Sequence, residues 1–340
     1  MYLSQINPAL SSFNFQRDTI SSGGVATLCA ALCALSTSRL DQFGPRVRKL
    51  HFFETDVGDS GAESCSDLMR VSAWLQDLFA SNCEISDEGA VSIASALRVN
   101  TCLRLLNLSD NDIGPDGFEA IGAALCVNSS LEVLDLGSNR NGAAGVAALV
   151  EALKLNTTLR KLYIDQIRVD SFGILCISVA LRINSSLTFL NLSHNDMGDD
   201  CVAVLSAALG VNSGLVRLDL GENGIGDRGA ALLSDALRMN VVLQRVSLFG
   251  NTIGDAGAVA LAATLRVNST LMSIEFGANK IGNSGAAALS EALCENAAIT
   301  RLDFYRNKIG SLGAQSLRKA ERENSRLQPF SLYGNPIDDS

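Results

Sequence analysis

Residue types that supply catalysis and metal binding are scarce in this 340-residue chain. Its two histidines, His51 and His194, lie in distant parts of the sequence, and no G-x-S-x-G, H-E-x-x-H or Walker A stretch occurs. The nine cysteines are scattered without a C-x-x-C pair, so free thiols in a reducing compartment are expected rather than zinc binding or a disulfide framework. These absences predict that the protein is not an enzyme and uses no metal or cofactor.

Long apolar runs and an excess of basic residues are also lacking. No apolar run reaches the ~18 residues that a membrane span needs, and the N-terminal segment does not resemble a signal peptide. The net charge of −9 repels phosphate backbones and anionic lipid surfaces. We therefore expect a cytoplasmic protein with a protein partner, and with neither nucleic acid, membrane nor small-molecule substrate.

What the chain does have is a repeat. The pattern L-x-x-L-x-L-x-x-N-x-I-G-x-x-G returns every 28 residues from Val47 to Leu327 without slippage, which is a specific signature of a repeat architecture. An atypical first copy begins at Leu10. We expect one domain with an N-terminal cap at 1–46, which holds the first copy and an insertion, ten repeats at 47–326 and a C-terminal capping half-repeat at 327–340.

Each part of the unit predicts a local structure. Leucines two apart, such as Leu134 and Leu136, place both side chains on the buried face of a short strand, and a helix with apolar residues at i and i+4 follows. An Asn where the strand ends can satisfy backbone groups of the turn and of the neighbouring copy. Aspartates such as Asp227 are expected to cap the N-terminus of their own helix. A second Asn register, for example Asn240, is expected to form a left-handed C-cap.

The copy "LRLLNLSDNDIGPDGFEAIGAALCVNSS", Leu103 to Ser130, resembles the ribonuclease-inhibitor-like leucine-rich-repeat family. Similar repeats form the ligand-sensing part of NOD-like receptors and the body of the Ran GTPase-activating protein. The resemblance implies an α/β leucine-rich-repeat solenoid, a horseshoe with parallel strands on the concave face and helices on the convex face. It is weak for function, because this fold serves many unrelated partners.

One stretch imitates a dinucleotide-binding loop. Gly224, Gly226 and Gly229 in "LDLGENGIGDRGAALL" have the spacing G-x-G-x-x-G between a strand-like and a helix-like segment. Gly226 and Gly229 recur in most copies, whereas the position of Gly224 holds other residues elsewhere, such as Asp196 and Lys280. One chance glycine therefore completes the motif, and no nucleotide site is expected.

Function is expected on the outward-facing strand positions. Exposed aromatic residues in the C-terminal half share one column and have arginines nearby, and Tyr and Arg are the usual interface anchors. The predicted partner-binding residues are Arg217, Arg245, Phe249, Arg301, Asp303, Tyr305, Arg306 and Tyr333. The alternative is a solvated face on which neighbouring charges, such as Arg301 and Asp303, neutralise each other.

Two other features have alternative interpretations. His51, Phe53 and Phe79 form either a second binding cluster or a packing surface for the insertion. In the adjacent irregular copies, Ile167 replaces the turn Asn, Asp170 a glycine, and Cys201 a helix-start glycine. These changes reflect either drift or a ligand-facing kink.

Two function classes follow from the sequence. The favoured hypothesis is a non-catalytic scaffold that binds a protein on its concave face. The alternative is a GTPase-activating protein of the Ran type, which acts through strand-to-helix loops. Members of that branch typically carry a strongly acidic C-terminal tail, whereas this sequence ends in "IDDS".

Overall fold

The computed structural model describes residues 11–17, 20–37, 47–140 and 143–337. The chain divides into two compact units, Met1–Ile167 and Arg168–Ser340. In the described ranges, eleven strands alternate with eleven helices, one pair per copy. The insertion expected at the end of the N-terminal cap lies outside the described residues from 38 to 46, and the division into cap, repeats and half-repeat stays a prediction.

The first unit holds six strands and five helices. Their bounds are β1 Ser12–Gln16, α1 Ser22–Thr37, β2 Lys49–Phe53, α2 Gly58–Val71, β3 Asp77–Ser81, α3 Asp87–Leu97, β4 Leu105–Asn107, α4 Pro115–Leu125, β5 Val133–Asp135, α5 Ala143–Leu155 and β6 Lys161–Tyr163.

The second unit holds six helices and five strands. Their bounds are α6 Ser171–Leu181, β7 Phe189–Asn191, α7 Gly198–Leu209, β8 Arg217–Asp219, α8 Asp227–Met239, β9 Arg245–Ser247, α9 Asp255–Leu265, β10 Ser273–Glu275, α10 Asn283–Glu295, β11 Arg301–Asp303 and α11 Ser311–Glu323.

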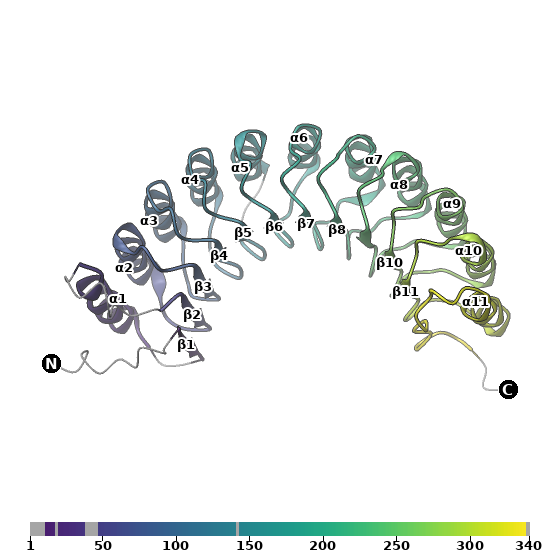
Figure 1. The fold of residues 1–340 in the computed structure, drawn as a ribbon, viewed down its shortest axis with the longest axis horizontal. Coiled ribbons are helices and arrows are strands. Elements are labelled where there is room, and N and C mark those ends of the chain that lie inside the picture. Colours follow the sequence, from purple (N-terminus) through teal and green to yellow (C-terminus); the bar gives the residue numbers. More distant parts are fainter. Residues whose placement is uncertain (1–10, 18–19, 38–46, 141–142, 338–340) are drawn as a thin grey trace. The chain divides into compact units, whose positions relative to one another are not determined.

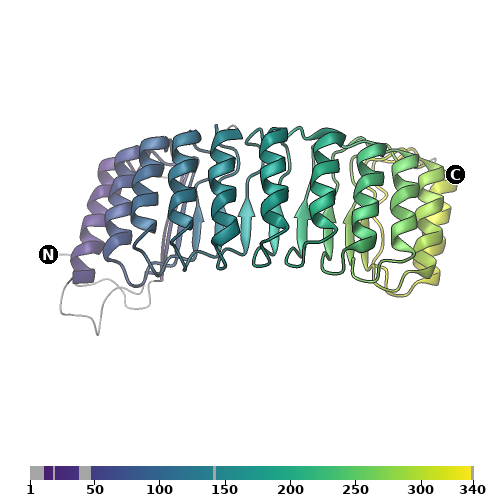
Figure 2. The same ribbon diagram turned by 90° about the horizontal axis from the view of Figure 1, so that it is seen from above.

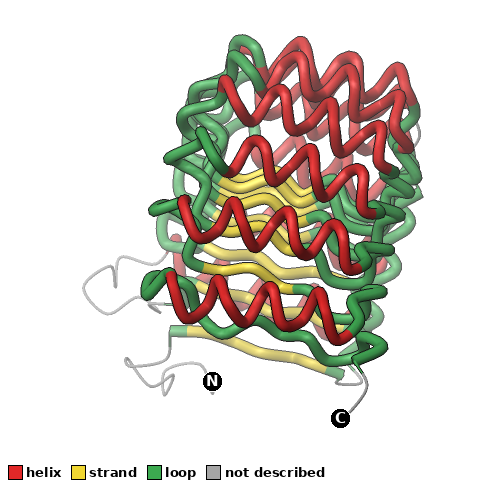
Figure 3. Tube along the Cα trace, turned by 90° about the vertical axis from the view of Figure 1, so that its right-hand side faces the viewer, coloured by secondary structure: helices red, strands yellow, loops and turns green. Residues whose placement is uncertain are grey.

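Each unit has two layers. The strands lie side by side in chain order along the inner side of the unit's arc, and the helices form the outer layer (Figure 1). The helices of each unit stand in a row when seen from the helix side, and a third view separates the helix layer from the strand layer (Figures 2 and 3). The paired strands are parallel and in register at the repeat period, as in Leu218 opposite Val246 and Ile274 opposite Leu302. This arrangement confirms the predicted solenoid architecture.

The core lies between the layers. In the three-residue strands, the central residue and the apolar residue two positions later point inward and are buried, as Leu134 and Leu136 are. The helices contribute their i and i+4 residues, such as Leu233 and Leu237, which are also buried. The predicted strand and helix periodicity is therefore confirmed. None of the helices in the described ranges is both long enough and apolar enough to cross a membrane.

The turn asparagines join neighbouring copies, as expected. The amide of Asn251 donates to the carbonyls of Leu220 and Leu248, both at 3.0 Å. Its carbonyl oxygen accepts the N–H groups of Asn223 at 3.1 Å and Ile225 at 2.9 Å. One buried side chain thereby satisfies four backbone groups, which explains why this position demands an amide.

The left-handed C-cap predicted for the second Asn register is wrong. Asn240 has φ −78° and ψ 127°, and Asn296 has φ −77° and ψ 125°, so both are extended. The side chain caps instead: the amide of Asn268 donates to Leu237 O at 2.7 Å in the preceding copy. Its carbonyl oxygen accepts the N–H of Leu271 at 2.7 Å, at the start of the following copy. An Asn recurs at this position because its side chain bridges two copies, and not because the backbone there is left-handed.

The predicted N-caps are wrong in a related way. Asp227 is the first residue of α8, and its carboxylate accepts the N–H groups of Gly254 at 2.7 Å and Gly257 at 2.9 Å, at the start of α9. Each such aspartate thus caps the helix of the following copy. The acceptor lies 27 and 30 residues before its donors, a relationship that the local sequence does not reveal.

Asp170 illustrates the exception. It is the N-cap of α6, and its carboxylate accepts the N–H of Gly173 in its own helix at 2.8 Å. The copy before it has Ala143 where five other copies have aspartate, and alanine offers no acceptor. The irregular "IDQIRVD" segment therefore contains a helix that caps itself, which gives a structural reason for an aspartate where most copies have glycine.

Candidate functional site

Four neighbouring strands of the second unit place polar side chains in one row on the strand face. Arg217, Arg245, Ser273 and Arg301 occupy the same position in β8, β9, β10 and β11, and the register pairs each with the next. Their buried neighbours in the strands hold the backbone, so these side chains must point outward. The row therefore presents three arginines with one small residue between the second and the third.

The row lines a recess of about 380 Å³. Its walls include Ser247 and Glu275 from the next row and Met272, Thr300 and Gln328 from the chain leading into the strands. No carboxylate of the described residues lies within ion-pair distance of Arg245 or Arg301. The alternative in which neighbouring charges neutralise each other as ion pairs therefore does not describe these two arginines.

Arg217 has a different neighbour. Its guanidinium carbon lies 4.9 Å from the centre of the Phe189 ring, within the range of a cation–π interaction. Phe189 is on β7, so the contact orients Arg217 from the neighbouring strand. No carboxylate in the described ranges lies within ion-pair distance of Arg217.

An aromatic pair lies one turn beyond the strands. Tyr305 and Tyr333 stack with ring centres 6.0 Å apart and planes 10° from parallel, and Tyr333 is 77% exposed. The guanidinium of Arg306 lies 5.1 Å from the centre of the Tyr305 ring. The structure thus brings three of the predicted residues together in one cluster, in which Tyr305 is half-buried and Arg306 and Tyr333 are exposed.

The two remaining predicted residues have other surroundings. Phe249 is 36% exposed and packs across the backbone of Gly277, because a Cβ at position 277 would lie 2.8 Å from its Cδ2 atom. Gly277 separates Phe249 from Tyr305 in the column. Asp303 is half-buried and accepts the N–H of Tyr305 at 2.9 Å, so its carboxylate holds the turn that carries the tyrosine.

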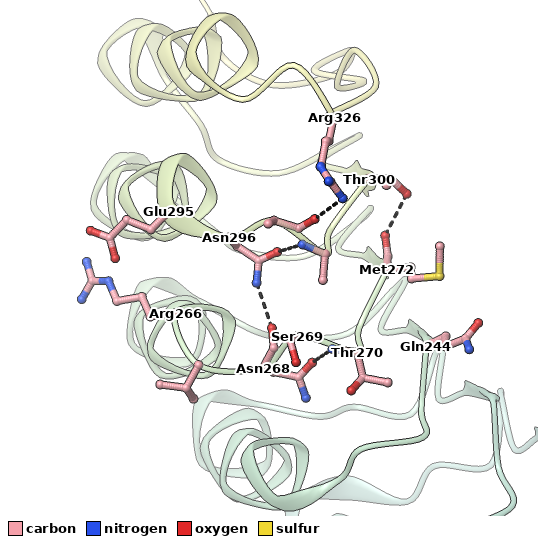
Figure 4. A pocket seen from close by; sticks show the side chains of 13 residues that line it. Gln244, Arg266, Asn268, Ser269, Thr270, Met272, Glu295, Asn296, Thr300 and Arg326 are labelled. Atoms are coloured by element: carbon pink, nitrogen blue, oxygen red, sulfur yellow. Dashed lines mark hydrogen bonds between the residues drawn. The ribbon is translucent and has the colours of Figure 1, made fainter.

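A second recess, of about 650 Å³, opens at the helix-to-strand edge near the ends of α9 and α10 (Figure 4). Its arginines already have partners: Arg266 pairs with Glu291 at 3.0 Å, and Arg326 donates to the carbonyl of Ala297 at 3.0 Å. The side chains of Asn268 and Asn296 are used by the backbone. This recess offers fewer uncommitted donors than the recess with the arginine row.

The first unit has its own aromatic contact on the strand face. His51 and Phe79, opposite each other on β2 and β3, stack with ring centres 4.2 Å apart. Partial burial, and secondarily the positive charge of Lys49, lowers the pKa of His51. A neutral imidazole stacks on a phenyl ring as an apolar partner, so this pair behaves as a packing contact.

Asp135, at the end of β5, is a carboxylate of the first unit whose pKa is shifted by its surroundings. Burial, opposed by a hydrogen bond from Gly137 N and reinforced by the charges of Asp165 and Asp110, raises the pKa of Asp135 to about 6. The carboxylate has a structural role, because its Oδ1 atom accepts the N–H of Gly137 at 3.1 Å and so holds the turn after β5.

The G-x-G-x-x-G stretch has no room for a pyrophosphate where such a motif would bind one. Asp199 Oδ1 already accepts the N–H of Gly226 at 2.7 Å at the start of α8. Gly224 has φ +69°, but Arg168 and Asp196 adopt the same left-handed conformation at the matching position of their copies. The expectation that the motif arose by chance from the repeat thus has a structural basis.

Sequence reasoning missed the residues that shape the arginine recess. Ser273 and Glu275 lie in the two outward columns, but neither stood out by type, whereas Met272, Thr300 and Gln328 precede the strands. For all five residues, the only signal in the sequence was the repeat register, which places them beside the arginines.

Comparison with known proteins agrees with this architecture. A family profile described as "Leucine Rich repeat" matches residues 74–94, 99–122, 127–150, 184–206, 211–234, 240–262 and 267–290. The chain is therefore a leucine-rich-repeat protein. The resemblance to the ribonuclease-inhibitor-like subtype is consistent with this assignment and stays a resemblance.

Two solved structures match this chain. The crystal structure of the Rad7 and Elc1 complex in yeast contains a chain with 14% sequence identity and a TM-score of 0.62; the match covers 98% of this chain and 78% of that one. Leiomodin-1 actin-binding site 2 has 20% identity and a TM-score of 0.40, over 45% of this chain and 87% of that one. No match was found among curated protein sequences.

Proposed function

We propose that this protein is a non-catalytic interaction scaffold that binds a protein partner through the strand face of its second unit. The observation that carries the proposal is the combination of Arg245 and Arg301, which have no carboxylate partner among the described residues, with the stacked pair of half-buried Tyr305 and exposed Tyr333. Arginine and tyrosine supply large contact areas and directed hydrogen bonds at interfaces. Rigid neighbouring strands hold both groups, so a partner meets a preorganised surface.

The similar fold of Rad7, which is described in a complex with Elc1, is compatible with such a role at the level of architecture. The charge balance also favours a protein partner, because the chain as a whole is acidic while this face gathers arginines. A stacked aromatic pair with one exposed ring, beside a charged recess, provides the apolar and polar parts that an interface needs.

The test is affinity capture with crosslinking, followed by binding measurements with the purified candidate. The wild type is compared with a Tyr305→Ala, Tyr333→Ala double variant, which removes the aromatic pair without changing the charge. Leu312→Ala on α11 serves as a control, because Leu312 is exposed on the helix layer. Circular dichroism checks that all three forms are folded.

We expect a partner whose affinity falls about tenfold or more in the tyrosine variant and is unchanged in the control. A partner that binds all forms equally would overturn the assignment of this face. If a captured GTPase hydrolyses GTP faster with either the wild type or the tyrosine variant, the Ran-type alternative replaces the scaffold.

A further inference from the structure

The arginine recess carries a net positive charge. Arg217, Arg245 and Arg301 contribute three positive charges and Glu275 one negative charge to its lining, which leaves a charge of +2 in a chain of net charge −9. Because Arg245 and Arg301 have no acidic partner among the described residues, a ligand does not have to break an ion pair to bind them. The recess therefore favours an occupant with about two negative charges.

The spacing of the row indicates how those charges should be arranged. Adjacent strands lie about 4.8 Å apart, so Arg217 and Arg245 are near neighbours, and Arg301 follows two strands further along with Ser273 between. One carboxylate fits between Arg217 and Arg245. A second, about 7 Å away over Ser273, can accept from the Ser273 hydroxyl and from Arg301.

An extended peptide supplies this spacing. Its chain rises about 3.4 Å per residue, so side chains two residues apart point the same way at about 6.8 Å. A single dianionic phosphate concentrates its charge at one point and cannot lie close to both Arg217 and Arg301, which are three strands apart. Two separated carboxylates match both the charge and the length of the row.

Resting on the scaffold function proposed above, we infer that the recess of Arg217, Arg245 and Arg301 binds an extended acidic segment of the partner. Two carboxylates two residues apart enter the recess, and the segment crosses β8 to β11. Tyr305 and Tyr333 lie beyond the strand ends, where they meet other parts of the partner.

The test uses fluorescence anisotropy with labelled peptides and the full chain. The probe is Gly-Ser-Glu-Ser-Glu-Ser-Gly, compared with its Gln counterpart and with Gly-Ser-Ser-Glu-Glu-Ser-Gly, which has the same composition but adjacent glutamates. We expect the first peptide to bind about tenfold more tightly than either comparison peptide, and more weakly as salt is raised. Equal binding of the two glutamate peptides would overturn the spacing, and equal binding of the Gln peptide would overturn the role of charge.

Variants locate the binding. Arg245→Gln with Arg301→Gln should weaken the first peptide about tenfold. Arg228→Gln with Arg266→Gln removes the same charge from the second unit outside the recess and should change its affinity less than twofold. Equal losses in both double variants would reduce the effect to net charge and overturn the site. A phosphoserine peptide that binds when the glutamate peptide does not would assign the recess to phosphate instead.

The two proposals fail differently. If the captured partner depends on Tyr305 and Tyr333 but keeps its affinity for the Arg245→Gln, Arg301→Gln variant, the scaffold stands and the acidic-segment inference is wrong. If the peptide binds as expected and no partner depends on the tyrosines, the recess is an acidic-peptide site and the proposed interface is wrong.

Discussion

The carboxylate of Asp199 caps a helix in the copy that follows its own, because its Oδ1 atom accepts the N–H of Gly226 at 2.7 Å. The same oxygen lies so near Gly229 that a Cβ there would be 2.5 Å from it. The second and third glycines of the G-x-G-x-x-G stretch are thus parts of a cap between copies, which is a structural role.

This relationship predicts losses of different size for two glycines of the motif. Gly229→Ala should lower the free energy of unfolding by about 1 to 3 kcal/mol, because the new methyl group displaces the capping carboxylate. Gly224→Asn should cost less than about 1 kcal/mol, since asparagine tolerates the left-handed conformation found there. Chemical denaturation of both variants measures the difference. Equal losses would show that Gly224 has a role beyond the turn.

Substitution of a buried turn asparagine should lower the free energy of unfolding strongly. Asn251→Ala leaves four backbone groups without their partner, so we expect a loss of roughly 2 to 4 kcal/mol in the free energy of unfolding. Asn251→Asp keeps an acceptor but loses the amide donor. Comparing it with Asn251→Ala therefore distinguishes the contribution of the donated hydrogen bonds from that of the accepted ones. A loss below about 1 kcal/mol for alanine would contradict the bridging role.

The self-capping helix gives a third prediction. Asp170→Ala removes the acceptor of Gly173 N and should destabilise the second unit by about 1 kcal/mol. The control is Asp116→Ala, since Asp116 lies in the first turn of α4 and makes no side-chain hydrogen bond. Hydrogen exchange at the start of α6 should accelerate only in the first variant. Unchanged exchange there would mean that the cap contributes nothing.

The raised pKa of Asp135 predicts how the free energy of unfolding depends on pH. Because its pKa is about 6 in the folded chain and near 3.8 ordinarily, the folded state retains a proton that the unfolded state releases between these values. The contribution of this group to stability is therefore fully present below about pH 4 and is lost as pH rises through about 6. The difference between the two pKa values corresponds to roughly 3 kcal/mol in the free energy of unfolding.

Asp135→Asn should remove that part of the pH dependence while keeping an oxygen that can accept the N–H of Gly137. Denaturant unfolding at a series of pH values measures the slope, and carboxyl NMR of the wild type measures the pKa directly. A wild-type slope that survives the substitution would assign the effect to another group.

Much of the fold could be predicted from the sequence. Leu134 and Leu136 are buried on one strand face, and Leu233 and Leu237 are buried on one helix face, because these patterns depend on local spacing. The candidate surface was accessible too, since the repeat register alone places Arg217, Arg245 and Arg301 in one column.

The capping interactions could not be read in the same way. Asp227 was expected to cap its own helix and caps the next one, and Asn240 was expected to be left-handed and is extended. In both cases the partner lies about one repeat away along the chain. A local pattern identifies which side chain caps, but not which copy it serves.

By itself the sequence determined the 28-residue period, the alternation of strands and helices, and which side of each strand faces the core, because all three follow from spacing within one copy. Only the tertiary structure decided that aspartates and asparagines bridge copies, that Arg245 and Arg301 have no carboxylate partner in the part of the chain that the structure describes, and that Ser273 and Glu275 complete a recess around them. These features depend on distances between neighbouring copies, which stacking sets and a single copy does not contain.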